Sequence, residues 1–493
     1  MLRESVRFPR WGAALGAAMA LWVLYVYGLN AIGVVGPDEP RYASIGRAMA
    51  TSGDWVTPRL WGAAWFEKPA LLYWMVAAGF RTGLPPEWAS RLPVALLSVA
   101  FLIGYWWILR RAFGQAVATC ASIFLGTSVG WLAFSAVAVT DLPLAALSAG
   151  ALLLVLDLLP DRQPTLRRLC VIAALLGGAV LAKGLVPLVL ALPACWALRR
   201  HWRKLLHPAP LATFLVVALP WYLLCWMRNG NQFLYTFFVQ HQFGRFTSDA
   251  LQHVRPFWFY IPVLIAGVYP WPLLLPTLFR RSLWQDARTR YLVQWFAFGF
   301  VFFSASRNKL PGYLLPLLPP LMALVGVSIM RTRRAAPLLA LTCILLIGLP
   351  LAMFLVPAAL AQGGPLFPIP EAAALRTALF LPLAFILAAV VYFGDRQGTR
   401  RVAMLITMAT VVCLLIGAIK RFTLPGIDAS VSPRALWHSV EHEPDVCVAA
   451  IHRAWRYGLN YYSVVPLPDC SVRPAALQIL PGAPRPVLSR VRQ

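Results

Sequence analysis

Acidic and basic side chains gather between residues 38 and 68, near the start of an otherwise apolar chain. They include Asp38, Glu39, Asp54 and Glu67 together with Arg41, Arg59 and Lys68. A carboxylate can accept a proton from an incoming hydroxyl, and Lys and Arg can hold a phosphate leaving group. Apolar segments flank this stretch, and long polar loops outside a membrane core commonly carry function. The pattern therefore predicts group transfer from a lipid phosphate, and a polyprenyl phosphate head group fits it.

The composition is that of a membrane protein. Of the 493 residues, 60% are hydrophobic and 13% are charged, whereas soluble domains carry about 25% charged residues. Apolar runs long enough to cross a bilayer recur along the chain, which predicts an all-α polytopic membrane protein. The formal net charge is +26. The arginines cluster in short loops between apolar runs, so they indicate membrane topology and argue against binding of nucleic acid.

The apolar runs predict about thirteen transmembrane helices. The first covers about 11–30 and follows Arg3, Arg7 and Arg10, which predicts an uncleaved signal anchor with a cytoplasmic N-terminus. The others are expected near 91–109, 115–133, 139–158, 168–183, 185–198, 208–227, 257–277, 290–305, 312–330, 337–356, 374–393 and 401–419. Basic residues occupy every second loop, so the first loop and the C-terminus lie outside. One broken helix over 168–198 is the alternative, and it would place the later basic loops outside.

The first outer loop, 31–90, is expected to hold two interfacial helices. Pro40 suits the first turn of a helix that Glu39 would cap. Tyr42, Ile45 and Met49 then form an apolar stripe, typical of a helix on a membrane surface. The apolar segment from Pro69 to about residue 80 is too short to span the bilayer. The loop is therefore expected to be anchored to the membrane at both ends.

The composition changes after Lys420, where apolar runs shorten and alternating stretches at 446–451 and 461–465 predict strands. A transmembrane domain is therefore expected over 1–420 and a small α/β domain outside the membrane over 421–493. Cys447 and Cys470 would form a disulfide in an oxidising compartment or stay as two thiols. Partners for the first loop are expected in other outer loops, among them 228–256; the candidates are Asp141, Lys183, His241, Arg245 and Tyr313.

Several motifs resemble one family of membrane enzymes. The first outer loop is similar to that of the aminoarabinose transferase-like family in the runs 38–42, 53–55, 57–59, 66–69 and 72–74. Later motifs follow in the family's order at 140–143, 182–184, His241 with Arg245, and 309–313, so the resemblance covers about 30–330. The family comprises polyprenyl-phosphate-sugar-dependent glycosyltransferases of the GT-C fold, and it is related to the protein O-mannosyltransferases. Thirteen spans and an outer C-terminal domain are similar to its plan.

The resemblance implies roles for individual residues. Asp38 matches the catalytic acid, and Asp141 matches a second acid near the site. The residues expected at the donor phosphate are Lys68, Arg245 and Tyr313, with the cations Arg41, Arg59 and Lys183. Glu67 and His241 match positions that could hold a divalent metal such as Zn²⁺, although two ligands are fewer than a zinc site normally has. No nucleotide cofactor is expected.

The expected function is that of an inverting pentosyl- or hexosyltransferase. It would move a sugar from an undecaprenyl-phosphate-linked donor to lipid A, or to another glycan, lipid or protein of the cell envelope, at the periplasmic face of the bacterial inner membrane. A flippase or transporter with the loop as a gate is the first alternative, but paired repeats and charges at the bilayer midplane are lacking. A glycan polymerase or ligase, which would need a lipid-linked oligosaccharide, is the second.

Overall fold

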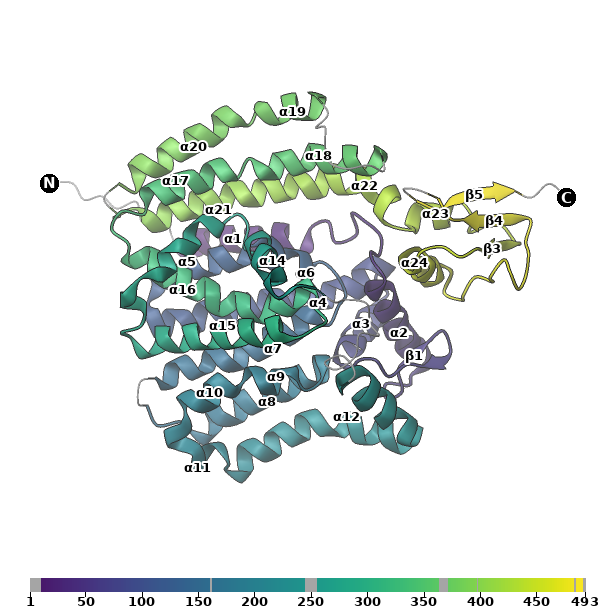
Figure 1. Ribbon diagram of the computed structural model, residues 1–493, viewed down its shortest axis with the longest axis horizontal. Helices are drawn as coiled ribbons and strands as arrows, with labels where there is room; N and C mark the ends of the chain where they lie inside the picture. Colours follow the sequence, from purple (N-terminus) through teal and green to yellow (C-terminus); the bar gives the residue numbers. More distant parts are fainter. Residues whose placement is uncertain are drawn as a thin grey trace.

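The helices of this protein run nearly side by side, and the polar first loop and the C-terminal segment collect at one end of them (Figure 1). The computed structural model describes residues 10–159, 162–243, 255–362, 371–396, 398–482 and 485–490. The first loop and the C-terminal strands lie together at that polar end, far apart in sequence but adjacent in space. The protein is therefore a mostly helical, multi-pass membrane protein with a small sheet near its C-terminus.

Seven helical segments among the described residues are long and apolar enough to cross a membrane. The first three are α4 (Pro86–Phe113), the segment Asp141–Leu158 with α7 (Asp141–Leu153), and the segment Pro208–Gln240 with α12 (Pro208–Leu234). The next two are Pro311–Arg331 with α16 (Leu318–Arg331), and Ala336–Leu355, which covers α17 (Ala336–Leu345) and the start of α18 (Gly348–Gln362). The last two are Leu375–Gly394 with α20 (Leu381–Gly394), and Arg401–Val431 with α21 (Arg401–Ala418) and α22 (Leu424–Val431).

Two broken pairs raise this number to nine if each pair is one span. In the first, α5 (Gln115–Gly126) and α6 (Val129–Ser135) meet at 63°; in the second, Phe257–Gly267, which contains α14 (Tyr260–Gly267), meets Pro272–Phe279 at 116°. Proline lacks the amide hydrogen that a helix needs, and Pro270 and Pro272 lie at the sharper break.

The remaining four predicted spans are helical but shorter or more polar. They are α1 (Arg10–Leu21) with Trp22–Val26, α8 (Leu166–Lys183), α9 (Val186–Leu190) with α10 (Leu192–Ala197), and α15 (Ala287–Ala305). Arginines in the first turn lower the apolar character of α8 and α15. The number thirteen therefore stays a prediction. At Gly184, with φ at +91°, the chain leaves α8 before α9 begins, so 168–198 is two helical segments.

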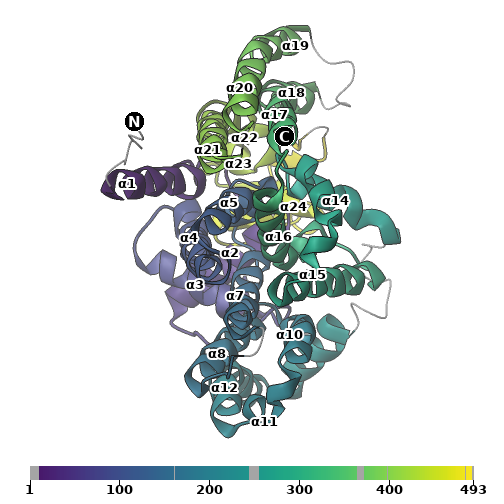
Figure 2. The same ribbon diagram turned by 90° about the vertical axis from the view of Figure 1, so that its left-hand side faces the viewer.

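The bundle has a buried centre with helices on two sides of it (Figure 2). Viewed along the helices, α7 and α16 lie in the middle, α8 and α12 lie on one side, and α17, α20 and α21 lie on the other. The segments around α7 and α16 are the most deeply buried of the candidate spans. α8 packs against both α7 and α12, which brings the outer ends of these helices next to the first loop.

The first outer loop folds into α2 (Asp38–Ser52), a two-stranded turn of β1 (Arg59–Leu60) and β2 (Ala63–Ala64), and α3 (Leu71–Arg81). The prediction that Glu39 caps the first helix is wrong, because α2 begins at Asp38 with Pro37 at the N-cap position. The apolar stripe of α2 is confirmed, but it faces protein: Tyr42 packs on Tyr73 of α3 with ring centroids 5.9 Å apart.

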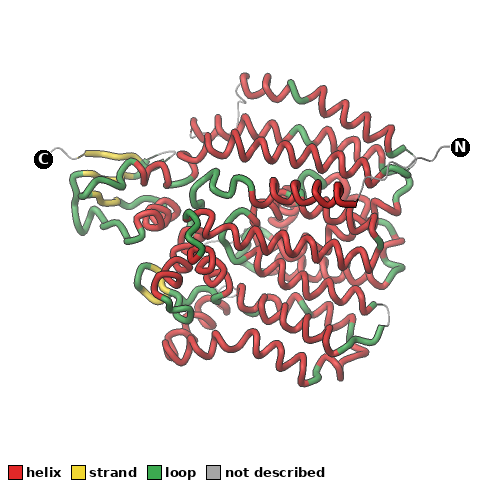
Figure 3. Tube along the Cα trace, turned by 180° about the vertical axis from the view of Figure 1, so that it is seen from behind, coloured by secondary structure: helices red, strands yellow, loops and turns green. Residues whose placement is uncertain are grey.

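The C-terminal segment contains the larger sheet of the described chain (Figure 3). β3 (Val446–Val448) pairs in parallel with β4 (Leu477–Leu480), which pairs antiparallel with β5 (Val487–Arg490). Cys447 and Cys470 form a disulfide. The predicted strand at 461–465 is wrong, because residues 461–463 belong to the helix α24 (Arg453–Ser463). The expected boundary at residue 420 falls inside a helical segment that continues to Val431.

Candidate active site

A chain of ion pairs joins four of the predicted site residues. Asp38 and Arg41 lie one turn apart on α2, a spacing that places both on one face, and the Arg41 guanidinium donates hydrogen bonds to the carboxylate of Asp38 and, at 2.9 Å, to that of Glu67. Lys68 Nζ lies 3.3 Å from Glu67. Glu67 and Lys68 are buried, whereas the Asp38 side chain is 46% exposed. Asp38 is therefore the accessible carboxylate of this chain of charges.

The surroundings of Arg41 fix its charge. Burial works against the charged guanidinium, but the nearby carboxylates of Glu67 and Asp38 outweigh it and raise the pKa of Arg41. Burial, followed by the charge of Glu67, raises the pKa of the Tyr73 phenol. Its hydroxyl is buried and has no hydrogen-bond partner among the residues that the structure describes. The protonated Tyr73 hydroxyl, which can donate a hydrogen bond, therefore lies close to the buried carboxylate of Glu67.

A second cluster forms where three segments meet. Asp141 is the first residue of α7 and Lys183 the last of α8, and their charged atoms lie 2.7 Å apart. Both positions also suit the helix dipoles, which favour an acid at the start and a base at the end. Lys183 Nζ lies 4.8 Å from the ring centre of Tyr313. Any side chain at Gly312 would collide with the Asp141 carboxylate, so glycine permits this close approach.

A buried carboxylate links the two clusters. Glu39 is 1% exposed and accepts two hydrogen bonds from Arg91 of α4, at 2.6 and 2.8 Å, and one from the amide of Ala138, at 3.1 Å. Ala138 lies three residues before Asp141. Leu71, three residues after Lys68, also packs against the apolar cluster of Leu144, Ala179 and Ala182, and Ala182 is next to Lys183.

Arg91 is the residue that sequence reasoning missed. The sequence did contain a signal for Arg91, because a charged arginine near the outer end of a predicted span costs free energy unless an acid or a carbonyl pairs with it. The Arg91 guanidinium also donates hydrogen bonds to three backbone carbonyls where the first span leads into the first loop, those of Leu29, Ile32 and Gly33. Arg91 therefore determines where α2, and with it Asp38, lies relative to the spans.

Three predicted residues do not join these clusters in the described chain. Arg59 is exposed and donates a hydrogen bond to the carbonyl of Gly62 within its own turn. Arg245 lies outside the described residues, and the side chain of His241 does too. Their expected roles stay predictions.

The described residues do not fit the expected metal. None of them form a group of three or more His, Cys, Asp or Glu side chains suited to a metal ion. The Glu67 carboxylate already lies against two cations, Arg41 and Lys68, which disfavours a third positive charge beside it. We derive no step through a metal.

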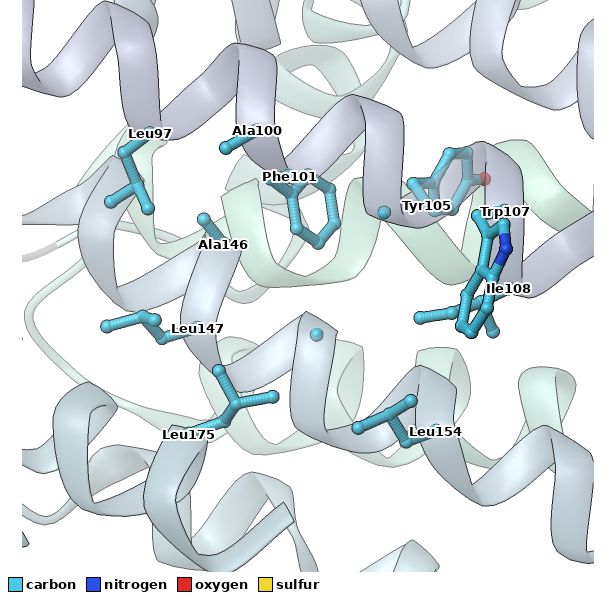
Figure 4. Close-up of a pocket in the computed structure, with 12 residues that line it drawn as sticks. Leu97, Ala100, Phe101, Tyr105, Trp107, Ile108, Ala146, Leu147, Leu154 and Leu175 are labelled. Carbon is cyan, nitrogen blue, oxygen red and sulfur yellow. The ribbon is translucent and has the colours of Figure 1, made fainter. Parts of the chain in front are cut away.

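An apolar groove lies between α4 and α7, with α8 at one side (Figure 4). Its volume is about 320 Å³. Small residues, Ala100 and Gly104 on α4 and Ala146 and Gly150 on α7, leave room along its length. The larger side chains that line it are those of Leu97, Phe101, Tyr105, Trp107, Ile108, Leu147, Leu154 and Leu175. The groove is shaped for a hydrocarbon chain.

Part of this chain is similar in sequence to known membrane glycosyltransferases. Residues 67–226 match the dolichyl-phosphate-mannose-protein mannosyltransferase family. An undecaprenyl phosphate-alpha-4-amino-4-deoxy-L-arabinose arabinosyl transferase of Pseudomonas fluorescens is 34% identical over 330 residues, which are 64% of this chain and 56% of the relative. One from Pseudomonas aeruginosa is 34% identical over 350 residues, 66% of this chain and 60% of the relative. The matched region is thus less than two thirds of each of these relatives.

Solved structures extend the likeness to nearly the whole chain. The crystal structure of ArnT from Cupriavidus metallidurans in the apo state has a TM-score of 0.74 and is 26% identical, with 93% of this chain and 85% of that chain covered. The same protein bound to undecaprenyl phosphate gives a TM-score of 0.73. The fold of this chain is therefore similar to that of ArnT. In sequence, the chain is similar to the undecaprenyl-phosphate aminoarabinose transferases, as the motifs of the first loop predicted.

Proposed function

We propose that this protein is an inverting glycosyltransferase that uses a polyprenyl-phosphate-linked sugar. The single observation that carries the proposal is the chain of charges from Asp38 through Arg41 and Glu67 to Lys68, with an exposed acid at one end and a buried cation at the other. An acid that faces an acceptor and a cation that faces a phosphate are what transfer from a sugar phosphate requires.

The proposed reaction forms one bond and breaks one. An acceptor oxygen attacks the anomeric carbon of the donor sugar, and the bond from that carbon to the phosphate oxygen breaks. Lys68, with Lys183 nearby, stabilises the charge on the departing polyprenyl phosphate. With a hydroxyl acceptor, Asp38 takes up the proton. With a phosphate acceptor, the attacking oxygen is already anionic, and Asp38 with Arg41 orients it.

We further propose that the groove of Figure 4 receives the prenyl tail. Ala146 lies five residues beyond Asp141 on α7, and Leu175 lies eight residues before Lys183 on α8. At 1.5 Å per residue, these residues are about 7.5 and 12 Å along their helices from the second cluster. A head group at Asp141 and Lys183 could therefore place its tail directly in the groove.

The relatives support a proposal for the donor. Their names specify an undecaprenyl-phosphate aminoarabinose donor, and ArnT has been crystallised with undecaprenyl phosphate. We propose the same donor for this chain and lipid A as its acceptor, with other envelope glycans, lipids or proteins as the alternatives. The site would then face the periplasm from the bacterial inner membrane, with the N-terminus in the cytoplasm.

Reconstitution tests the proposal directly. Purified protein in liposomes with a defined polyprenyl-phosphate sugar and lipid A should yield a glycosylated product detectable by mass spectrometry. Asp38→Asn should lower the rate with a hydroxyl acceptor at least about 100-fold. Asp286→Asn is the matched control, because this carboxylate caps the start of α15, where Asn can accept the same hydrogen bond, and the substitution should leave the rate unchanged.

Two outcomes would contradict the proposal. Transfer by Asp38→Asn at the wild-type rate would exclude Asp38 as the catalyst. Movement of the labelled donor across sealed vesicles without a covalent product would identify a flippase. Lipid A and surface glycans from cells with and without the protein would identify the acceptor.

A further inference from the structure

The helix α24 of the C-terminal segment docks on the first loop through specific polar contacts. Arg47 of α2 donates a hydrogen bond to the carbonyl of Tyr461 at 2.8 Å, and its guanidinium lies 4.3 Å from the centre of the Tyr461 ring. Tyr462 donates to Glu87 at 2.8 Å and accepts from the amide of Val34 at 3.1 Å. These contacts fix α24 against α2, beside the β1–β2 turn (Figure 1).

The docked helix brings Tyr457 to the chain of charges. Tyr457 lies one turn before Tyr461, so both residues face the loop. The Tyr457 ring centre lies 5.6 Å from that of Trp61, and the Arg41 guanidinium lies 5.6 Å from the ring centres of both Tyr457 and Trp65. The rings of Trp65 and Tyr457 therefore lie beside the guanidinium that holds Asp38, and Trp61 extends this aromatic group through Tyr457. All three are only partly buried.

The turn that carries Trp61 holds a costly conformation. Trp61 has a φ of +48° and Gly62 a φ of +89°, as a two-residue turn between β1 and β2 requires, and a bulky residue rarely adopts this conformation. The indole N–H groups of Trp61 and Trp65 also have no hydrogen-bond partner within the described parts of the chain. Such donors favour a ligand that brings its own oxygen atoms.

We propose that Trp61, Trp65 and Tyr457 form an aromatic wall that packs against a sugar ring beside Asp38. A sugar presents apolar C–H groups on its faces and hydroxyl oxygens at its edge, which suits aromatic faces with N–H donors. The C-terminal segment thereby contributes a specificity residue, Tyr457, to a site built otherwise by the first loop. The sugar ring is that of the donor or that of the acceptor.

The inference rests on the proposed function, and kinetics with both substrates test it. Tyr457→Ala should raise the KM for the substrate whose sugar packs here by about five- to tenfold, with a smaller change in kcat. Tyr457→Phe keeps the ring and should stay within about twofold of the wild type. Trp61→Ala, on a different element, should raise the same KM. Tyr392→Ala, on α20 far from the loop, is the matched control.

The pattern of KM values decides the source of the sugar. A rise for the donor alone assigns the wall to the donor sugar, and a rise for the acceptor alone assigns it to the acceptor. Unchanged KM values for both substrates would overturn the proposal. A Phe variant as impaired as the Ala variant would overturn it too, because the ring would then not be what matters.

Binding without turnover separates this inference from the proposed function. If the wall holds the donor sugar, the wild type should bind the polyprenyl-phosphate sugar more tightly than polyprenyl phosphate alone, and Trp61→Ala should lose that difference. If the wild type shows this preference but forms no product, the transferase proposal fails and the wall stands. If the wild type transfers sugar and neither Tyr457→Ala nor Trp61→Ala changes a KM, the aromatic wall is rejected as a sugar-binding surface and the transferase proposal stands.

Discussion

Arg91→Met is the sharpest test of how the loop is held. Arg91 and Glu39 are 2% and 1% exposed at their side chains. The substitution removes both charged hydrogen bonds to Glu39 and three to the carbonyls of residues 29, 32 and 33. Of its hydrogen bonds within the described residues, Glu39 would keep those from the amides of Val35 and Ala138. Because breaking a buried pair leaves an uncompensated charge, we expect the free energy of unfolding to fall by about 3–5 kcal/mol.

A double-mutant cycle in mixed detergent micelles measures this interaction. Arg91→Met, Glu39→Gln and the double variant are unfolded by increasing SDS, and the free energies are compared. The double variant should lose less than the sum of the single losses, because both remove the same contact. Arg110→Met, an exposed arginine near the other end of α4, is the control and should change stability by less than about 0.5 kcal/mol.

The same variant should also impair transfer. Asp38 precedes Glu39 on α2, so a shift of this helix moves the proposed catalytic carboxylate, and a misplacement of about 1 Å can lower a rate about 100-fold. The reasoning would be refuted by an Arg91→Met protein as stable as the wild type, or by single losses that add without any coupling.

Three further predictions concern other contacts. Gly312→Ala should lower the transfer rate about tenfold or more, because the added methyl displaces Asp141; wild-type kcat would contradict this close approach. Reduction of the Cys447–Cys470 disulfide should destabilise the C-terminal sheet by about 3 kcal/mol, seen as faster proteolysis there. Burial and Glu87 raise the pKa of Tyr462, so its docking contact should hold below about pH 10, the ordinary tyrosine pKa, and weaken above it. Proteolysis of the C-terminal segment should accelerate accordingly, and Tyr462→Phe should reduce that pH dependence.

The spacing of residues in the sequence was enough to predict the ion pairs of the first loop. Asp38 and Arg41 are one turn apart on a helix, and Glu67 is next to Lys68, so their pairings need little tertiary information. The pair of Asp141 and Lys183 is different. Both were candidates at the outer ends of spans, but only the packing of α7 against α8 shows that they bind one another.

Two errors came from rules that consider only neighbours in sequence. Glu39 resembled a helix cap because of its position before Pro40, but its partner Arg91 is 52 residues away. Residues 461–465 resembled a strand because tyrosine and valine favour sheets. Residues 461–463 are instead the last turn of α24, because Tyr461 and Tyr462 gain contacts with Arg47 and Glu87 there.

The sequence by itself determined the membrane class, the positions of the helical segments and the loop that holds the acids and bases. These depend on hydrophobicity and on residues near one another in the chain, which local rules describe well. The tertiary structure decided that α24 covers the first loop, that Glu39 is buried against Arg91, and that Tyr457 reaches Arg41. Such contacts join residues 52 to 428 positions apart. They form because packing the whole bundle brings the ends of distant helices together, and no local pattern encodes that arrangement.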